Sequence, residues 1–266
     1  MQQQFTGIKS RFSAIKKSFI LFGLFFSIQI YAQDLYEIQV YKSETEQAGV
    51  TEYELHSNIS LIGKKESENG IAPSHHQLRE TLEITHGFND WFETGFYFFT
   101  TNTQTDGFNY VGSSFRPRVR VPDKWKCPVG LSLSMELQYM NPMYNANTWA
   151  WEIRPIIDKT IGNFYFAFNP TLERNFVGAE AEEGFIFSPN FKLGYNITPA
   201  LQAGFEYYGE IGSISNIDPI PNQHHMLVPA IDWQFADRWE FNVGVMFGMS
   251  AVSEPLVFKT IIAREF

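Results

Sequence analysis

The chain has 266 residues, of which 44% are hydrophobic and 17% aromatic, and its formal net charge is −9. This acidic balance excludes nucleic acid as an expected partner, because binding it requires a basic surface that neutralises phosphates. The single cysteine, Cys127, excludes an internal disulfide and a thiol-based metal or redox site, and no cofactor is expected. The length suits one large all-β unit.

Residues 1–33 have the organisation of a secretory signal peptide. Basic residues such as Lys16 and Lys17 precede the apolar run FILFGLFFSIQI, and Tyr31-Ala32-Gln33 offers a cleavage region with a small residue. An N-terminal membrane anchor is the alternative, but the run falls short of the about 20 apolar residues that a spanning helix needs. We therefore expect export, and cleavage would leave a more acidic mature chain.

Residues 34–52 form a polar, acidic lead-in that contains the sequence SETEQ. The short apolar alternation at its start is compatible either with a periplasmic segment or with one that faces the lumen of a barrel. The sequence leaves both interpretations open, and with them the question whether this segment plugs a pore.

Residues 53–266 contain about twelve segments with the period-2 alternation of β-strands. The segment LSLSMELQY is typical, because Leu131 and Met135 belong to an apolar face while Ser134 and Glu136 belong to a polar face. Segments of about 10 residues have the length that a tilted strand needs to cross a bilayer. We therefore predict an all-β fold, a transmembrane antiparallel up-and-down β-barrel of about 12 strands.

Short and long connections between these segments alternate along the chain. Short ones are expected at 89–90, 122–128, 162–163, 198–199 and 236–238, and longer polar ones near 63–75, 102–109, 141–147, 175–183 and 212–222. A barrel with short periplasmic turns and longer outer loops predicts this alternation, and an even strand number puts both termini in the periplasm. Tryptophans cluster near both kinds of connection, where the aromatic girdles of a membrane barrel lie.

Five prolines fall inside predicted strands, although a central strand normally excludes proline. The alternation continues through each of them without a change of phase, and all five belong to the outward phase. We expect local bulges or lost ladder hydrogen bonds at these positions rather than strand ends. The prolines are Pro117, Pro155, Pro170, Pro189 and Pro229.

The chain ends on the strand FKTIIAREF, whose last residue is the aromatic Phe266. This ending resembles the C-terminal targeting strand of outer-membrane β-barrels, which implies that the barrel-assembly machinery reads Phe266 as an assembly signal. We expect the protein in the cell outer membrane of a Gram-negative bacterium, with membrane lipid against its apolar phase. A soluble sandwich or lipocalin-like barrel is the alternative, but it would need neither the girdles nor the terminal Phe.

The polar phase of the strands would line the lumen. Its sharpest feature is FRPRVRV, an arginine stripe on one strand, and hairpin register places Arg118 near Glu93. The stripe either guides an anionic or polar solute or belongs to an ion-pair network; we favour the network, because small barrels are usually packed with side chains. The candidate lumen-lining residues are Glu93, Arg116, Arg118, Arg120, Glu136, Glu152, Arg154 and Asp158.

Two histidine pairs, 75–76 and 224–225, are expected at the outer rim. Adjacent strand residues point to opposite faces, so neither pair chelates a metal as a unit, and rim hydrogen bonding is the expected role. An outer-membrane phospholipase is the enzyme alternative, but it would require a serine within reach of His225 or His76, and no catalytic motif marks one. We therefore expect neither a metal site nor an enzyme.

The hairpins FKLGYNITPALQAGFEYYGEIG and LVPAIDWQFADRWEFNVGVMFG, together with the terminal strand, resemble outer-membrane proteins of the meta-pathway phenol-degradation transporter family. The tripeptide at the signal cleavage region and the richness in aromatics resemble proteins of the Bacteroidota. The family resemblance implies a small porin-like barrel for passive transport of small solutes, including hydrophobic or aromatic compounds. A sealed structural or surface barrel without transport is the alternative function, ahead of a lipid hydrolase.

Overall fold

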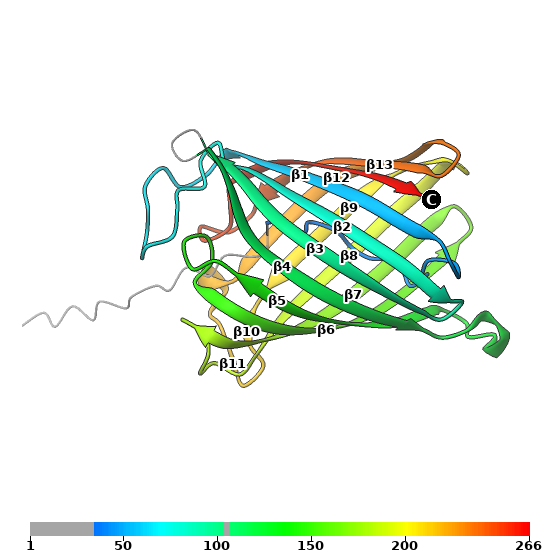
Figure 1. Ribbon diagram of the computed structural model, residues 1–266, viewed down its shortest axis with the longest axis horizontal. Coiled ribbons are helices and arrows are strands. Elements are labelled where there is room, and N and C mark those ends of the chain that lie inside the picture. Colours follow the sequence, from blue (N-terminus) through cyan, green and yellow to red (C-terminus); the bar gives the residue numbers. More distant parts are fainter. Residues whose placement is uncertain (1–34, 104–106) are drawn as a thin grey trace, which may run out of the picture.

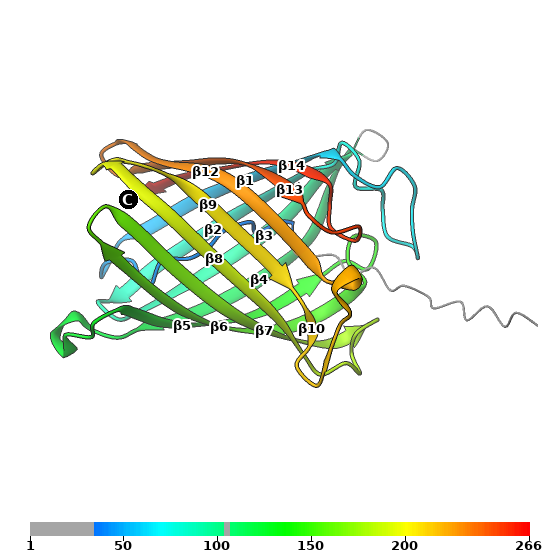
Figure 2. The same cartoon turned by 180° about the vertical axis from the view of Figure 1, so that it is seen from behind.

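The computed structural model describes residues 35–103 and 107–266, and in this part of the chain twelve long antiparallel strands close into a barrel (Figure 1, Figure 2). The predicted fold is thereby confirmed. The predicted signal peptide, residues 1–33, lies outside the described residues. No helix in the described ranges has the length and apolar character needed to cross a membrane.

The strands follow one another in chain order around the barrel, apart from two short additions in a loop. The long strands are β1 (Thr51–Ile62), β2 (Leu78–Asn89), β3 (Phe92–Thr103), β4 (Gly107–Arg120), β5 (Gly130–Met140), β6 (Asn147–Ile161), β7 (Phe164–Gly178), β8 (Phe185–Thr198), β9 (Leu201–Glu210), β12 (His224–Ala236), β13 (Trp239–Gly248) and β14 (Leu256–Glu265). The connections hold β10 (Gly212–Ser213), β11 (Asn216–Ile217) and the short 3-10 helices η1 (Asp123–Trp125) and η2 (Ile220–Asn222).

The first and last strands close the barrel. β1 pairs with β14 from Glu52 opposite Glu265 onward, and the Phe266 N–H donates to the Thr51 carbonyl at 2.8 Å. Every long strand therefore has two neighbours, which removes the exposed edges that a membrane does not tolerate. The position of Phe266 on the closing strand is compatible with its predicted role as an assembly signal, which stays a prediction.

The two ends of the barrel differ in their connections. The turns after β2, β6, β8 and β12 are only two residues long, and they lie at the same end as the C-terminus, at the right of Figure 1. The longer connections after β1, β9 and β13 lie at the other end. The connection after β4, residues 121–129 with η1, lies at the short-turn end although it is not short, so the prediction of a short connection at 122–128 is wrong. Because outer-membrane barrels carry short turns on the periplasmic side, we expect the short-turn end to face the periplasm.

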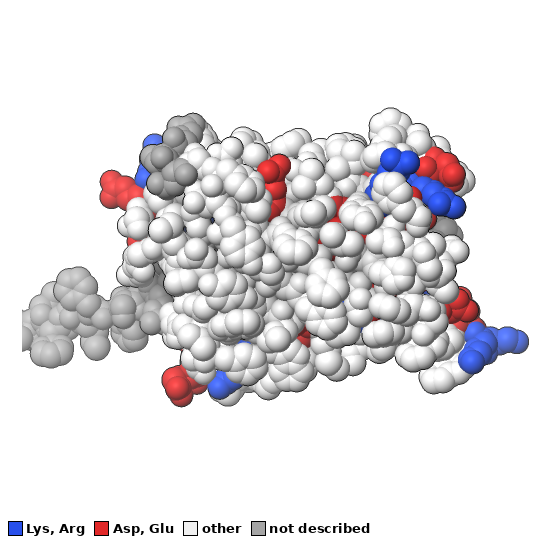
Figure 3. All heavy atoms as spheres, viewed as in Figure 1, with Lys and Arg blue, Asp and Glu red and all other residues white. Residues whose placement is uncertain are grey.

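The two faces of the wall follow the predicted alternation. Met135 is 39% exposed on the outside of β5, whereas its neighbours Ser134 and Glu136 are buried inside. Figure 3 shows a wide uncharged surface with most charged side chains gathered at the two ends of the barrel. The apolar outer band and the closed barrel are those of an outer-membrane protein, where lipid covers the outward residues.

None of the five prolines ends a strand, as predicted, and four of them fall at gaps in a ladder, whereas Pro189 stands opposite Pro170 in an unbroken register. Pairing between β4 and β5 skips from Phe115 to Arg118 around Pro117. The β6 and β7 ladder has a gap that contains Pro155 and Pro170, and the β12 and β13 ladder has one at Pro229. A proline cannot donate a ladder hydrogen bond, so each gap is local and the strand keeps its phase.

Residues 35–50 lie inside the barrel rather than outside it, and β1 begins at Thr51, two residues before the predicted boundary. We call residues 35–50 the lumen segment. It has no regular secondary structure, and its main chain passes through the interior as the blue trace visible between the strands of Figure 2. The beginning of the described chain therefore occupies part of the interior of the barrel.

Candidate functional site

The lumen segment runs from the middle of the barrel toward the short-turn end. Near its start, the Leu35 carbonyl accepts a hydrogen bond of 3.0 Å from the Asn58 side chain in β1. At its end, the Gly49 N–H donates to the carbonyl of Gly87, beside the turn after β2, at 2.8 Å. The segment therefore turns back at the short-turn end to enter β1.

Side chains of the wall hold the main chain of this segment. Asn169 on β7 accepts from the Tyr41 N–H at 2.7 Å and donates to the Tyr41 carbonyl at 3.1 Å. Lys259 on β14 donates to the Ile38 carbonyl at 2.8 Å. Asn169 and Lys259 lie far apart in the sequence. Their hydrogen bonds satisfy main-chain N–H and carbonyl groups of the segment that would otherwise be buried without partners.

Apolar side chains of the segment pack against two walls of the barrel. Leu35, Ile38 and Val40 belong to a buried cluster with residues of β7, β9, β12, β13 and β14. Tyr36 belongs to a second cluster with residues of β3, β4 and β5. Because these walls face each other in the strand order, the segment bridges the lumen at this level.

Four charged residues on β2, β3 and β4 form what we call the arginine cluster: Glu83, Glu93, Arg116 and Arg118. Arg116 donates to Glu83 at 2.6 Å and to Glu93 at 3.1 Å, and an Arg118 nitrogen lies 2.6 Å from Glu93. β3 and β4 pair with Glu93 opposite Arg118, which confirms the predicted register. All four side chains are almost completely buried, and the opposite charges neutralise one another.

The arginine cluster also holds the lumen segment. Arg118 donates to the carbonyls of Lys42 and Glu44, and Glu93 accepts from the Glu46 N–H at 2.6 Å. The ring of Tyr41 lies beneath the guanidinium groups of Arg116 and Arg118, with its centroid 5.2 and 5.8 Å from their central carbons. An aromatic face attracts cations at such distances, so the stripe predicted from the sequence anchors the segment.

A second group, which we call the lysine cluster, comprises Lys192, Glu206, Asp232 and Lys259. Lys259 lies 2.5 Å from Glu206, and Lys192 lies 3.2 Å from Glu206 and 2.8 Å from Asp232. Lys259 is fully buried and was not among the candidates from the sequence. The alternation of FKTIIAREF places the Lys259 side chain inward, so the sequence of the terminal strand contains the information needed to predict it as a lumen residue.

The remaining candidates lie in three different places. Arg120 is at the short-turn rim and pairs with exposed Asp123, away from the arginine cluster. Arg154 lies 2.7 Å from Glu152 and 2.8 Å from Glu37 of the lumen segment, and Glu136 lines a cavity of about 40 Å³ beside them. Asp158 accepts from the N–H and hydroxyl of Ser43 at 2.8 and 2.7 Å.

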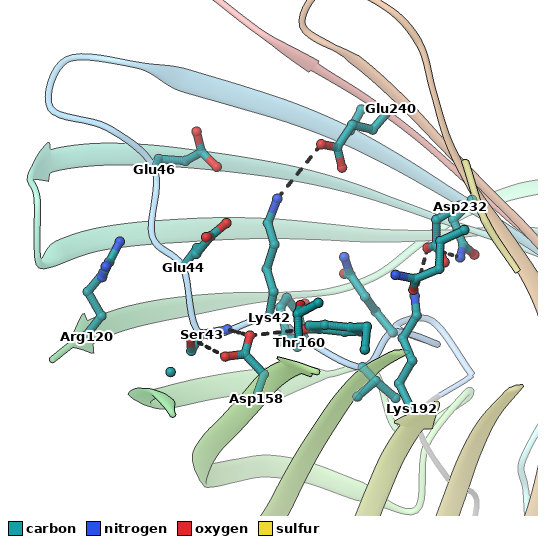
Figure 4. A pocket seen from close by; sticks show the side chains of 18 of the residues that line it. Lys42, Ser43, Glu44, Glu46, Arg120, Asp158, Thr160, Lys192, Asp232 and Glu240 are labelled. Carbon is teal, nitrogen blue, oxygen red and sulfur yellow. Dashed lines mark hydrogen bonds and ion pairs between the residues drawn. The ribbon is translucent and has the colours of Figure 1, made fainter. Parts of the chain in front are cut away.

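A larger cavity of about 790 Å³ occupies the short-turn end, and we call it the vestibule (Figure 4). Lys42, Ser43, Glu44 and Glu46 of the lumen segment line it, together with wall residues from the turns at that end. Figure 4 shows Lys42 reaching across it toward Glu240, at a distance of 3.9 Å. The vestibule therefore has charged walls, and the lumen segment passes along it toward the middle of the barrel.

Glu46 lies at the base of the segment, where three carboxylates meet. Its side chain, Glu52 and Glu265 have carboxylate oxygens within 4.8 Å of one another. Burial raises the pKa of Glu46 from its ordinary value of 4.5 to about 7, with further increases from Glu265 and Glu93 that Lys42 and Arg118 oppose. Ionisation of Glu46 therefore disfavours the docked segment.

The histidine pairs make local contacts at the rim. The rings of His75 and His76 stack with centroids 3.8 Å apart. The His225 ring lies within hydrogen-bonding distance of Tyr207, at 2.7 Å, and of Gln223, whereas Ser253 contacts the main chain of His225. Ser253 therefore does not form with the His225 imidazole the hydrogen bond that lipid hydrolysis would require.

The comparisons with known proteins support the fold. No family model matches the chain, so the predicted phenol-transporter family is not confirmed, and no curated protein matches either. Among solved structures, the KdgM porin has a TM-score of 0.52 and 9% identity over 81% of this chain and 99% of its own. The KdgM porin in complex with disordered oligogalacturonate has a TM-score of 0.51 and 11% identity over the same shares. The chain thus has the fold of outer-membrane porin barrels.

Proposed function

We propose that this protein is an outer-membrane channel that its own lumen segment keeps closed at rest. The observation that carries the proposal is that the vestibule ends at a segment that crosses the lumen, and that side chains of the wall hold this segment in place. Side-chain hydrogen bonds and ion pairs exchange readily with water, whereas a strand of the barrel could leave only by breaking the ladder. Displacement of the segment would join the vestibule to the long-loop end.

The charges of the vestibule indicate the class of solute. Lys42, Arg120 and Lys192 contribute positive charges to its wall, and Asp158, Asp232 and Glu240 contribute negative ones. A wall of this kind compensates the lost hydration of a small polar or charged solute, but it offers little to an aromatic one. We therefore favour polar solutes over the aromatic compounds that the family resemblance implies.

A sealed barrel without transport is the second candidate. Its support is the number of buried ion pairs within the wall and between the wall and the segment, such as the pair of Arg154 with Glu37. Buried charges that are neutralised in this way are costly to separate, because each partner left behind is desolvated. In a sealed barrel the segment would be a permanent part of the interior.

A glycine substitution separates the two candidates. A Cβ added at Gly87 would overlap the main-chain oxygens of Gln47 and Glu46, so Gly87→Ala forces the base of the segment away from β2. Gly248→Ala is the matched control, because its Cβ would overlap the main-chain oxygen of Glu254 in a loop at the opposite end. Both variants add one methyl group to a strand.

We expect Gly87→Ala in planar bilayers to raise the open fraction about tenfold over the wild type, which corresponds to about 1.4 kcal/mol. Gly248→Ala should leave the open fraction unchanged. Heat-modifiable electrophoretic mobility verifies that both barrels are folded. Folded Gly87→Ala protein that conducts no more than the control would favour the sealed barrel over the channel.

A further inference from the structure

We propose that the lumen is a binding site for an extended peptide, and that the lumen segment is its resident ligand in cis. The ligand class is an extended peptide that carries an acidic residue among apolar and aromatic ones. It would reach the site from the periplasmic side through the vestibule. This inference concerns binding and does not depend on whether the barrel conducts.

The first argument is that the wall recognises main-chain atoms. Asn169 holds both the N–H and the carbonyl of Tyr41, the arrangement that a neighbouring strand would otherwise provide. Further main-chain contacts come from the side chains of Asn58, Thr81, Glu93, Arg118, Asp158 and Lys259. Main-chain groups are the same in every peptide, so these side chains would fit any backbone extended in this way.

The second argument is that the wall also selects side chains. Tyr36 enters the cluster formed by β3, β4 and β5, and the Glu37 carboxylate lies 2.8 Å from Arg154. Tyr41 lies below three guanidinium groups, the nearest being that of Arg154 at 4.7 Å from the ring centroid. These contacts prefer the order aromatic, acidic, apolar and aromatic, which is the order of YEIQVY.

The third argument is that the ligand is separable from the barrel. Hydrogen bonds between the main chain of the segment and that of the wall begin at Gly49. Residues 47–49 are exposed at the short-turn end, where a protease can reach them. One cut there would leave twelve strands closed and turn the segment into a bound peptide.

The experiment uses the full chain with a protease recognition sequence in place of residues 47–48, cut after folding and purification in detergent. The probe is a fluorescent peptide with the sequence LYEIQVYKSETE, and its binding is followed by fluorescence anisotropy. We expect saturable binding to the cut protein, and little binding to the uncut protein, whose tethered segment competes at millimolar effective concentration. A peptide with Tyr41→Ala should bind about tenfold more weakly, and a scrambled peptide weaker still.

A second variant removes the need for a cut. Tyr41→Ala in the full chain weakens the resident segment, so this protein should take up the fluorescent peptide while the wild type does not. Adding Asn169→Ala should reduce that uptake, because it removes two main-chain contacts. Absence of uptake by both the cut protein and the folded Tyr41→Ala variant, or equal binding of native and scrambled peptides, would overturn the proposal whatever the conductance.

Discussion

The arginine cluster and the lysine cluster are alike in composition but differ in what they hold. Each combines two basic and two acidic groups inside the barrel, on β2 to β4 in the arginine cluster and on β8, β9, β12 and β14 in the lysine cluster. Arg118 and Glu93 of the arginine cluster bind the main chain of the lumen segment at three places, whereas the lysine cluster reaches it once, through Lys259 and the Ile38 carbonyl. The first cluster therefore anchors the segment, and the second chiefly ties strands of the wall together.

The clusters also differ in their access to water. Residues of both clusters line the vestibule, but the Asp232 side chain of the lysine cluster is 34% exposed. The side chains of Glu83, Glu93 and Arg116 are at most 3% exposed. Because water screens charges, removal of one partner should cost more in the arginine cluster than in the lysine cluster.

The strongest test of this comparison is Arg116→Ala. The substitution leaves buried Glu83 without its guanidinium partner and weakens the neutralisation of buried Glu93, so we expect a loss of about 3 to 5 kcal/mol in the free energy of unfolding. Arg120→Ala, four residues along the same strand, removes a rim pair with exposed Asp123 and should cost under about 1 kcal/mol. Urea unfolding in lipid vesicles measures both. Equal losses would mean that water reaches the arginine cluster.

A substitution on the lipid face of the barrel shows what a charge without any partner costs, and this cost is a reference for the two clusters. Met135→Arg places a cation in the outer apolar band and should cost about 2 to 4 kcal/mol if it lies near the bilayer midplane. Leu137→Met, a change of shape on the same face, is the control and should cost under about 1.5 kcal/mol. Full tolerance of Met135→Arg in the vesicle assay would contradict the assignment of the outward face.

The inward neighbour of Met135 is a poorer reference than the sequence alone indicates. Ser134 pairs with Arg118 on one side and with Arg154 on the other. The alternation alone would predict that Ser134→Arg costs less than Met135→Arg if the lumen has room, but an arginine at this position would lie between two guanidinium groups. The alternation predicts which way a side chain points, but it does not predict its neighbours across strands.

The same limit explains how much of the site could be predicted. Strand number, both faces, the proline gaps and the pair of Arg118 with Glu93 follow from local alternation and from hairpin register, which act over short stretches of chain. The contact of Tyr41 with Asn169 joins residues 128 positions apart. No periodicity indicates such a contact, so the sequence alone does not place residues 34–52 in the lumen. For the same reason it does not predict that the arginine cluster binds the main chain of the lumen segment.

In the lysine cluster, Lys259→Met tests the other half of the comparison. Glu206 keeps Lys192 as a partner, so we expect a loss of about 1.5 to 3 kcal/mol, the range for a hydrogen bond to a charged group and below that of Arg116→Ala. The open fraction in planar bilayers should stay close to that of the wild type, because most anchors of the segment remain. A rise in conductance as large as that of Gly87→Ala would show that the lysine cluster is also an anchor.

The last expected effect is a pH dependence at the base of the lumen segment, beside the arginine cluster. Glu46 faces Lys42 of its own segment, Glu52 and Glu265 on the closing strands, and Glu93 and Arg118 of the cluster. Its pKa is about 7 when the segment is docked, against an ordinary value of 4.5, so the docked form binds a proton more readily than the released form. Docking should therefore be strongest below about pH 4.5, weaken between 4.5 and 7, and stay at its weakest above 7.

Glu46→Gln removes this titration, because the amide stays neutral. We expect the open fraction of the wild type to rise between about pH 5 and about pH 7, while that of Glu46→Gln stays at the low value throughout. Glu44→Gln, at an exposed position of the same segment, should keep the slope of the wild type. An equal slope in Glu46→Gln would assign the pH dependence to another group, and a wild-type open fraction that falls as the pH rises would contradict the expected sign. Either of these two outcomes would mean that ionisation of Glu46 does not control the release of the segment.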